Sequence, residues 1–191
     1  MAENERKILC LGDSNTYGYS PDGLFSSRYK ESVRWTGLLK YAGWRVYNRG
    51  VNGALVPSEH QFESFADTIE SASPLCFVTV MYGTNDVVSG KSAEDTGERM
   101  ERFLGAVKGS LGNARLVLIA PPPVKFGYWV PVQSVISESE KLAACYKNAA
   151  EKQGVLFCDA GSWGVGLTGD GVHFTEEGHR AFFDGLSEII K

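Results

Sequence analysis

Five short apolar runs are spaced along the chain and alternate with longer segments of helical periodicity. The central positions of each run are almost all apolar, which is typical of strands covered on both faces in a parallel sheet. The runs occupy residues 7–12, 44–50, 75–83, 114–123 and 155–161. The helical segments occupy residues 34–43, 58–71, 92–111, 134–154 and 175–191.

This alternation of strand and helix predicts βαβ units, whose crossovers place helices on both faces of a sheet. We therefore expect an α/β fold with three layers, α/β/α, around a five-stranded parallel sheet. No repeat or low-complexity linker divides the sequence, so residues 1–191 are expected to form a single domain. Thr175 precedes two acidic residues and is the expected cap of the last helix.

Small polar turns occur where three of the predicted strands end, at residues 12–14, 48–53 and 83–86. Two longer non-helical stretches, residues 15–32 and 121–131, also follow strand ends. Parallel strands bring their carboxyl ends to one edge of a sheet, where open α/β folds bind their ligands. We therefore expect these turns to converge.

A serine, an aspartate and a histidine near this edge suggest a nucleophilic site. Asp170 lies three residues before His173 across a glycine-containing turn, so its carboxylate can hold the imidazole in one tautomer. The other ring nitrogen could then take a proton from Ser14. Each piece also has an ordinary interpretation, because Gly, Asp, Ser and Asn are common turn residues. Their occurrence in order, on loops at the predicted edge, favours the catalytic interpretation.

The motifs GDSN, NRGVNG, GTND and DGVH occur at residues 12–15, 48–53, 83–86 and 170–173. In order and spacing they resemble the four conserved blocks of the SGNH (GDSL) hydrolase family, which has a flavodoxin-like fold. RWTG and APPP resemble its arylesterase/acyltransferase branch, and the resemblance extends along the whole chain. One position differs, because the family's name motif ends in leucine where this chain has Asn15.

The resemblance implies a serine esterase or acyl hydrolase that cleaves small carboxylic esters, with transfer of the acyl group to other alcohols as a related activity. It makes Ser14 the nucleophile, His173 the general base and acid, and Asp170 the residue that orients His173. The oxyanion hole would comprise the backbone N–H groups of Ser14 and Gly53 and the side-chain amide of Asn85. No metal or organic cofactor is expected.

The sequence leaves the natural substrate open. Small esters are favoured, deacetylation of sugars is the main alternative, and lysophospholipid or thioester hydrolysis are others. A catalytically silent binding protein on the same fold is the non-enzymatic alternative, although every catalytic residue type is present. A flavodoxin-like nucleotide binder is disfavoured, because the loop at residues 12–15 places an acid where a phosphate would bind.

Aromatic residues are concentrated in the two long loops that follow strand ends. They could form a small apolar acyl pocket near Ser14, or equally pack the loops and cover a subunit interface. The resemblance to a branch that includes oligomers favours a homo-oligomer. The candidate pocket residues, with the valine between the catalytic pair, are Tyr17, Tyr19, Phe25, Phe126, Tyr128, Trp129 and Val172.

Five other polar residues have structural interpretations. Asp13 is expected to stabilise its turn, and Asp86 and Arg34 are expected to hold loops in place through hydrogen bonds. His60 is expected on the surface of a helix. His179, within the last helix, is expected either to pack or to be solvated.

Composition narrows the class of protein. Of 191 residues, 43% are hydrophobic and 22% charged, which is ordinary for a soluble globular protein. The net charge is −4 and the basic residues form no run, which argues against a nucleic-acid partner. No apolar run approaches the roughly 20 residues of a membrane span. The first residues, MAENERK, lack the apolar core of a signal peptide.

The four cysteines show no paired close spacing. Cys10, Cys76 and Cys158 lie in strand-like runs and are expected to be buried free thiols. A cytoplasmic location is therefore expected, or a secreted one if a signal peptide has been removed.

Overall fold

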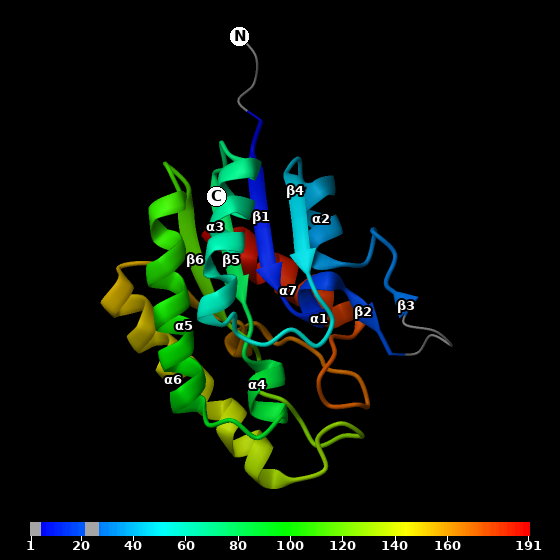
Figure 1. Ribbon diagram of the computed structural model, residues 1–191. Helices are drawn as coiled ribbons and strands as arrows, with labels where there is room; N and C mark the ends of the chain where they lie inside the picture. Colours follow the sequence, from blue (N-terminus) through cyan, green and yellow to red (C-terminus); the bar gives the residue numbers. More distant parts are fainter. Residues whose placement is uncertain (1–4, 22–26) are drawn as a thin grey trace.

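Five parallel strands form the central sheet of the computed structural model, which describes residues 5–21 and 27–191 (Figure 1). The strand order is β4-β1-β5-β6-β7, and all four neighbouring pairs are parallel. The predicted five-stranded parallel sheet is thus confirmed. The strands are β1 (Lys7–Gly12), β4 (Arg45–Gly50), β5 (Phe77–Met81), β6 (Arg115–Ala120) and β7 (Leu156–Asp159).

Helices cover both faces of this sheet, which confirms the three predicted layers (Figure 1). One face carries α2 (Trp35–Tyr41) and α7 (Glu176–Ile189), and the other carries α3 (Phe62–Ala72), α5 (Ala93–Val107) and α6 (Gln133–Gln153). None of the helices in the described ranges is long and apolar enough to cross a membrane.

The uninterrupted apolar character of the strands follows from this double covering. Successive residues of a strand point to opposite faces, so Ile8 packs with Trp35 of α2 while Leu9 joins the cluster that contains Phe103 of α5. Thr175 caps α7 as expected, because its Oγ1 accepts a hydrogen bond from the Gly178 N–H at 2.9 Å.

Several short elements complete the fold. Those at residues 59–61 and 108–110 lie within predicted helical segments, and the others were not predicted from the sequence. The prediction that residues 15–32 are non-helical is wrong for residues 15–17, because they belong to α1, a single helical turn that begins at Ser14. Gly18, with φ of +90°, ends it in the left-handed conformation that favours glycine. The short elements are α1 (Ser14–Tyr17), α4 (Thr84–Val88), the antiparallel strands β2 (Tyr19–Ser20) and β3 (Ser27–Arg28), and the 3₁₀ turns η1 (Glu59–Gln61), η2 (Lys108–Ser110) and η3 (Ala160–Trp163).

All four cysteines are free thiols, but only two of the three expected to be buried are buried. Burial raises the pKa of Cys10 to about 12 and that of Cys158 to about 11. The prediction is wrong for Cys76, which is exposed. Cys76 belongs to the apolar run in the sequence, but it lies one residue before β5, the part of this run that forms a strand covered on both faces.

Candidate active site

The turns that were expected to converge leave the sheet side by side. Gly12, the last residue of β1, lies in register with Gly50 of β4 and with Met81 of β5. Ser14 follows as the first residue of α1 and is 4% exposed. The chain beyond each of these three strands therefore starts from the same edge.

A chain of hydrogen bonds links Ser14, His173 and Asp170. The Nε2 atom of His173 lies 3.0 Å from the Ser14 Oγ, and its Nδ1 atom lies 2.6 Å from the Asp170 Oδ2. A carboxylate can only accept hydrogen bonds, so it selects the tautomer with the proton on Nδ1. Nε2 then presents its lone pair to the serine hydroxyl, which is the arrangement needed to remove the serine proton.

Asp170 also organises the loop that carries His173. Its Oδ1 accepts hydrogen bonds from the N–H of Val172 at 2.8 Å, the N–H of His173 at 2.9 Å and the Thr168 hydroxyl at 2.8 Å. Partial burial works against ionisation. The hydrogen bonds from His173, Val172 and Thr168 outweigh it and hold the pKa of Asp170 well below its usual value.

Gly53 lies in the loop after β4 with φ of +73°, a conformation that side chains other than glycine rarely adopt. A Cβ at this position would meet no atom within 4 Å. Glycine is thus required here by the backbone conformation and not by crowding within the folded chain.

A cavity of about 190 Å³ opens beside Ser14 and His173. Gly53 and Asn85 both line it, and the Asn85 Nδ2 donates one hydrogen bond to the Ala54 carbonyl at 2.9 Å. This hydrogen bond orients the Asn85 amide and uses one of its two N–H groups, so the second N–H does not take part in the contact with Ala54. Four of the five residues expected at the site, Ser14, Gly53, Asn85 and His173, therefore line one cavity, and the fifth, Asp170, contacts His173 from outside the lining.

Only some of the residues predicted to form the substrate pocket line this cavity. Tyr19, Trp129 and Val172 do, and the Tyr19 and Trp129 ring centroids lie 4.6 Å and 6.5 Å from that of His173.

The other aromatic candidates lie elsewhere. Tyr17 does not line the cavity and instead packs under the Arg28 guanidinium, whose Cζ is 4.2 Å from the ring centroid. Phe126 and Tyr128 are 71% and 88% exposed and also lie outside the lining, whereas Phe25 falls outside the described residues.

Asp13 stabilises the turn before α1, as expected. Its Oδ1 accepts a hydrogen bond from the Asn15 N–H at 3.0 Å and caps the helix, while its buried Oδ2 has no hydrogen-bond partner. Burial raises the pKa of Asp13 to about 6, although the hydrogen bond from the Asn15 N–H and the proximity of His173 oppose the shift.

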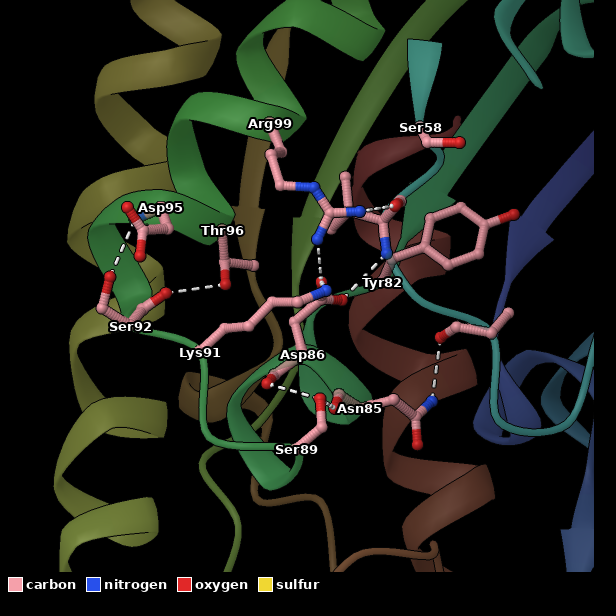
Figure 2. A network of polar contacts seen from close by, with 12 residues as sticks. Ser58, Tyr82, Asn85, Asp86, Ser89, Lys91, Ser92, Asp95, Thr96 and Arg99 are labelled. Carbon is pink, nitrogen blue, oxygen red and sulfur yellow. Dashed lines mark hydrogen bonds and ion pairs between the residues drawn. The ribbon is translucent and has the colours of Figure 1, made fainter. Parts of the chain in front are cut away.

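Asp86 has the structural role predicted for it and anchors the loop that carries Gly53 (Figure 2). It is fully buried, and its Oδ2 accepts a hydrogen bond from the Val56 N–H at 2.8 Å. Its Oδ1 pairs with Arg99 at 2.6 Å and Lys91 at 3.1 Å. Arg99 also donates to the Val56 carbonyl at 2.6 Å, so both backbone groups of Val56 are held.

Removal of Arg99 should therefore destabilise the fold. We expect Arg99→Met to lower the free energy of unfolding by about 3 kcal/mol, because it leaves Asp86 buried with one of its two cations missing. Arg102→Met is the matched control on the same helix. The ion pairs of Arg102 with Glu59 and Glu98 are exposed, so this substitution should cost less than about 1 kcal/mol. Urea denaturation measures both, and equal losses would contradict this role of Arg99.

The remaining polar residues also have structural surroundings. Arg34 holds a loop as expected, by donating from Nη1 to the Tyr29 carbonyl at 2.8 Å. His60 is exposed in η1, in agreement with the prediction. His179 packs and is not solvated: it is fully buried between the rings of Tyr29 and Phe174, with centroid distances of 5.2 Å and 5.4 Å.

His179 should make the fold sensitive to acid. Both its ring nitrogens are buried without a partner, and burial, with the charges of Arg34 and His173, lowers its pKa to about 3. In the unfolded chain this histidine has an ordinary pKa of about 6.5, so it binds a proton at a higher pH than the buried histidine does. The free energy of unfolding therefore decreases as the pH is lowered below about 6.5, by about 1.4 kcal/mol per pH unit.

The measurement is urea denaturation of wild type and His179→Leu at pH 7 and pH 5. We expect the difference in unfolding free energy between the two proteins to shift by about 2 kcal/mol in favour of the leucine variant at pH 5. The opposite contribution of Asp13, whose pKa is raised, is present in both proteins and cancels. An unchanged difference would show that His179 does not carry the acid sensitivity.

No group of three His, Cys, Asp or Glu residues within residues 5–21 and 27–191 is arranged to hold a metal ion.

The comparisons with known proteins agree with this geometry. The model of the GDSL-like lipase/acylhydrolase family matches residues 10–181. The chain belongs to this family. An aryl esterase structure from M. smegmatis is 27% identical over 97% of this chain and 98% of that one, with a TM-score of 0.81. The sequence has no significant match among curated proteins.

A second solved structure adds a related activity class. A carbohydrate acetylesterase family member from Sinorhizobium meliloti is 25% identical over 97% of both chains, with a TM-score of 0.84. Membership of the GDSL family makes this chain a hydrolase of ester bonds with the GDSL-type α/β fold.

Three residues that the motifs did not single out also belong to the site of this GDSL-family hydrolase. Asn52 and Val88 line the cavity, and Asn15 contacts the loop that carries His173. Asn52 lies within the motif at residues 48–53 and Val88 lies two residues after the motif at residues 83–86, so their positions in or near these motifs were the only available signal. Asn15 was visible as the departure from the family's leucine.

Proposed function

We propose that this GDSL-family hydrolase cleaves small carboxylic esters through an acyl-enzyme formed on Ser14. The observation that carries the proposal is the hydrogen-bonded chain from Ser14 through His173 to Asp170, which opens on a cavity of about 190 Å³. The nucleophile, the base and the group that orients the base are all within hydrogen-bond reach of one another.

In the first step the Ser14 Oγ attacks the ester carbonyl while its proton passes to the Nε2 of His173. The carboxylate of Asp170 stabilises the imidazolium that forms. His173 then gives the proton to the departing alcohol. In the second step water, or another alcohol, attacks the acyl group with His173 again acting as the base, and free Ser14 is regenerated.

Negative charge develops on the carbonyl oxygen in both steps. The N–H groups of Ser14 and Gly53 and the remaining amide N–H of Asn85 would donate to it. The Asn85–Ala54 hydrogen bond and the anchoring of the loop by Asp86 fix these donors before the substrate arrives. Such preorganised donors stabilise the transition state more than the ground state.

The size and lining of the cavity support a short acyl group. Its walls include the apolar groups of Tyr19, Val88, Trp129 and Val172, and its volume of about 190 Å³ is small for a ligand pocket. A long acyl chain would extend past these walls into water.

The test is a series of p-nitrophenyl acetate, butyrate and octanoate. We expect kcat/KM to be highest for acetate and at least about tenfold lower for octanoate, because the distal methylenes find no apolar contact. The Trp129→Ala substitution removes one wall of the cavity and should reduce the ratio of kcat/KM for acetate to kcat/KM for octanoate. Equal or better hydrolysis of octanoate by the wild type would contradict the small pocket.

Deacetylation of sugars is the second candidate. It is favoured by the rim of the cavity, where Trp129 is 57% exposed and can stack on a sugar ring, and by the carbohydrate acetylesterase neighbour. An acetylated monosaccharide with kcat/KM above that of p-nitrophenyl acetate would favour this substrate, and no acetate release from it would exclude it.

A further inference from the structure

The side chain of Asn15 bridges the segment of the nucleophile and the loop of the histidine. Its Nδ2 donates to the Val172 carbonyl at 3.1 Å, and its Oδ1 accepts from the Phe174 N–H at 3.0 Å. One amide thus engages both neighbours of His173 from a position adjacent to Ser14. Asn15 is itself 2% exposed, so water does not compete effectively for these bonds.

No other hydrogen bonds join these two segments in the part of the chain that the structure describes, apart from that between Ser14 and His173. The opposite side of the loop is held by a different segment: the Lys125 N–H donates to the Gly171 carbonyl at 2.9 Å and the Trp129 N–H to that of Asp170 at 3.0 Å. The spacing between His173 and Ser14 therefore depends on Asn15.

Asn15 is well suited to hold the loop because its own backbone is fixed. Its N–H donates to Asp13 at 3.0 Å, and its carbonyl accepts from the buried Trp35 Nε1 at 3.0 Å. The side-chain hydrogen bonds of Asn15 therefore connect the loop of His173 to a fixed part of the backbone, which is itself held by Asp13 and by Trp35 of α2.

We propose that Asn15 is a positioning residue that keeps His173 at proton-transfer distance from Ser14, an inference that rests on the proposed function. The imidazole must take a proton from the serine and deliver it to the leaving alcohol, so its loop must stay in place while its charge changes. Proton transfer is steep in distance, and a misplacement of about 1 Å can cost about 10²-fold in rate.

The chemistry of the two backbone groups explains why this position holds an amide. The Val172 carbonyl needs a donor and the Phe174 N–H needs an acceptor, and asparagine supplies both. Leucine, the residue of the family's name motif, supplies neither. An aspartate supplies both only while it is protonated.

The experiment compares wild type, Asn15→Leu and Asn15→Asp in hydrolysis of p-nitrophenyl acetate between pH 5 and pH 9. We expect Asn15→Leu to lower kcat by about 10- to 100-fold with little change in KM, because transition-state geometry is lost and substrate binding is not. For Asn15→Asp we expect the activity relative to wild type to be highest at low pH and to fall as the new carboxyl ionises.

Val117→Ala controls for destabilisation alone, because Val117 is buried in β6 away from the site and should leave kcat unchanged. The proposal would be overturned if both Asn15 variants had the kcat of the wild type and a ratio of variant to wild-type activity that does not change with pH. It would also be overturned if their losses in kcat were no larger than that of Val117→Ala. If Asn15→Leu does not fold, the pH dependence of the Asn15→Asp ratio decides alone.

Failure of the proposed function would appear separately, as absence of ester hydrolysis by the wild type. In that case a crystal structure of Asn15→Leu gives the answer without a substrate. We expect His173 Nε2 to move out of hydrogen-bond reach of Ser14 Oγ, and an unchanged distance of 3.0 Å would overturn the positioning role.

Discussion

A Ser14→Ala enzyme is expected to lose kcat for p-nitrophenyl acetate by about 10⁶-fold, the scale on which loss of an activated serine affects serine hydrolases. The reason is that the methyl group can neither attack the carbonyl nor carry the acyl group between the two steps. His173 and Asp170 would remain, but they have no hydroxyl to activate.

Stopped assays at high enzyme concentration, with circular dichroism and urea denaturation of the variant, provide the measurement. Ser162→Ala is the matched control, because this serine is exposed in η3 and its hydroxyl donates to the Asp159 carbonyl at 2.7 Å, away from the site. Its activity should equal that of the wild type. Substantial turnover by folded Ser14→Ala would place the nucleophile elsewhere.

Asp170→Asn should have the next largest effect, a loss of about 10⁴-fold in kcat with the fold retained. The asparagine amide would donate to His173 Nδ1, which selects the tautomer with its proton on Nε2. That proton would then point at the Ser14 hydroxyl, and the ring could no longer accept the serine proton.

The pH profile distinguishes this tautomer effect from a general loss of structure. The pKa of Asp170 lies well below its usual value, so the wild-type carboxylate stays ionised throughout pH 5 to 9 and does not itself titrate in the kcat/KM profile. Asp184→Asn is the control, because Asp184 makes an exposed ion pair with Arg180 on α7. An Asp170→Asn enzyme with near-normal kcat would contradict the assigned role.

The layers of the fold and its five parallel strands could largely be predicted because their signals are local. Each strand is covered on both faces, so its apolar run is continuous, as in the pairing of Ile8 with Trp35 and of Leu9 with the opposite core. The short helix α1 gave no such signal. It has four residues, too few for a period to appear, and depends on the Asp13 cap and on Gly18.

The site was predictable as far as its motifs reach. Gly-Asp-Ser and Asp-Gly-Val-His are each a short contiguous motif that can be recognised in the sequence, and the fold around the parallel sheet brings the two motifs together. The contacts that refine the site are long-range: Asn15 bonds to residues 157 and 159 positions away, and Asp86 to Val56, 30 positions away. Likewise, nothing local distinguishes Tyr19, which lines the cavity, from Tyr17, which packs against Arg28.

The most direct test of the central claim is to identify the atom that receives the acyl group. A p-nitrophenyl alkylphosphonate mimics the tetrahedral intermediate and stays bound to an activated serine. We predict release of one p-nitrophenol per chain, complete loss of esterase activity and, by peptide mass spectrometry, a single phosphonyl group on Ser14 that is absent in His173→Ala. A label on another residue, or full activity after Ser14 is labelled, would contradict the account.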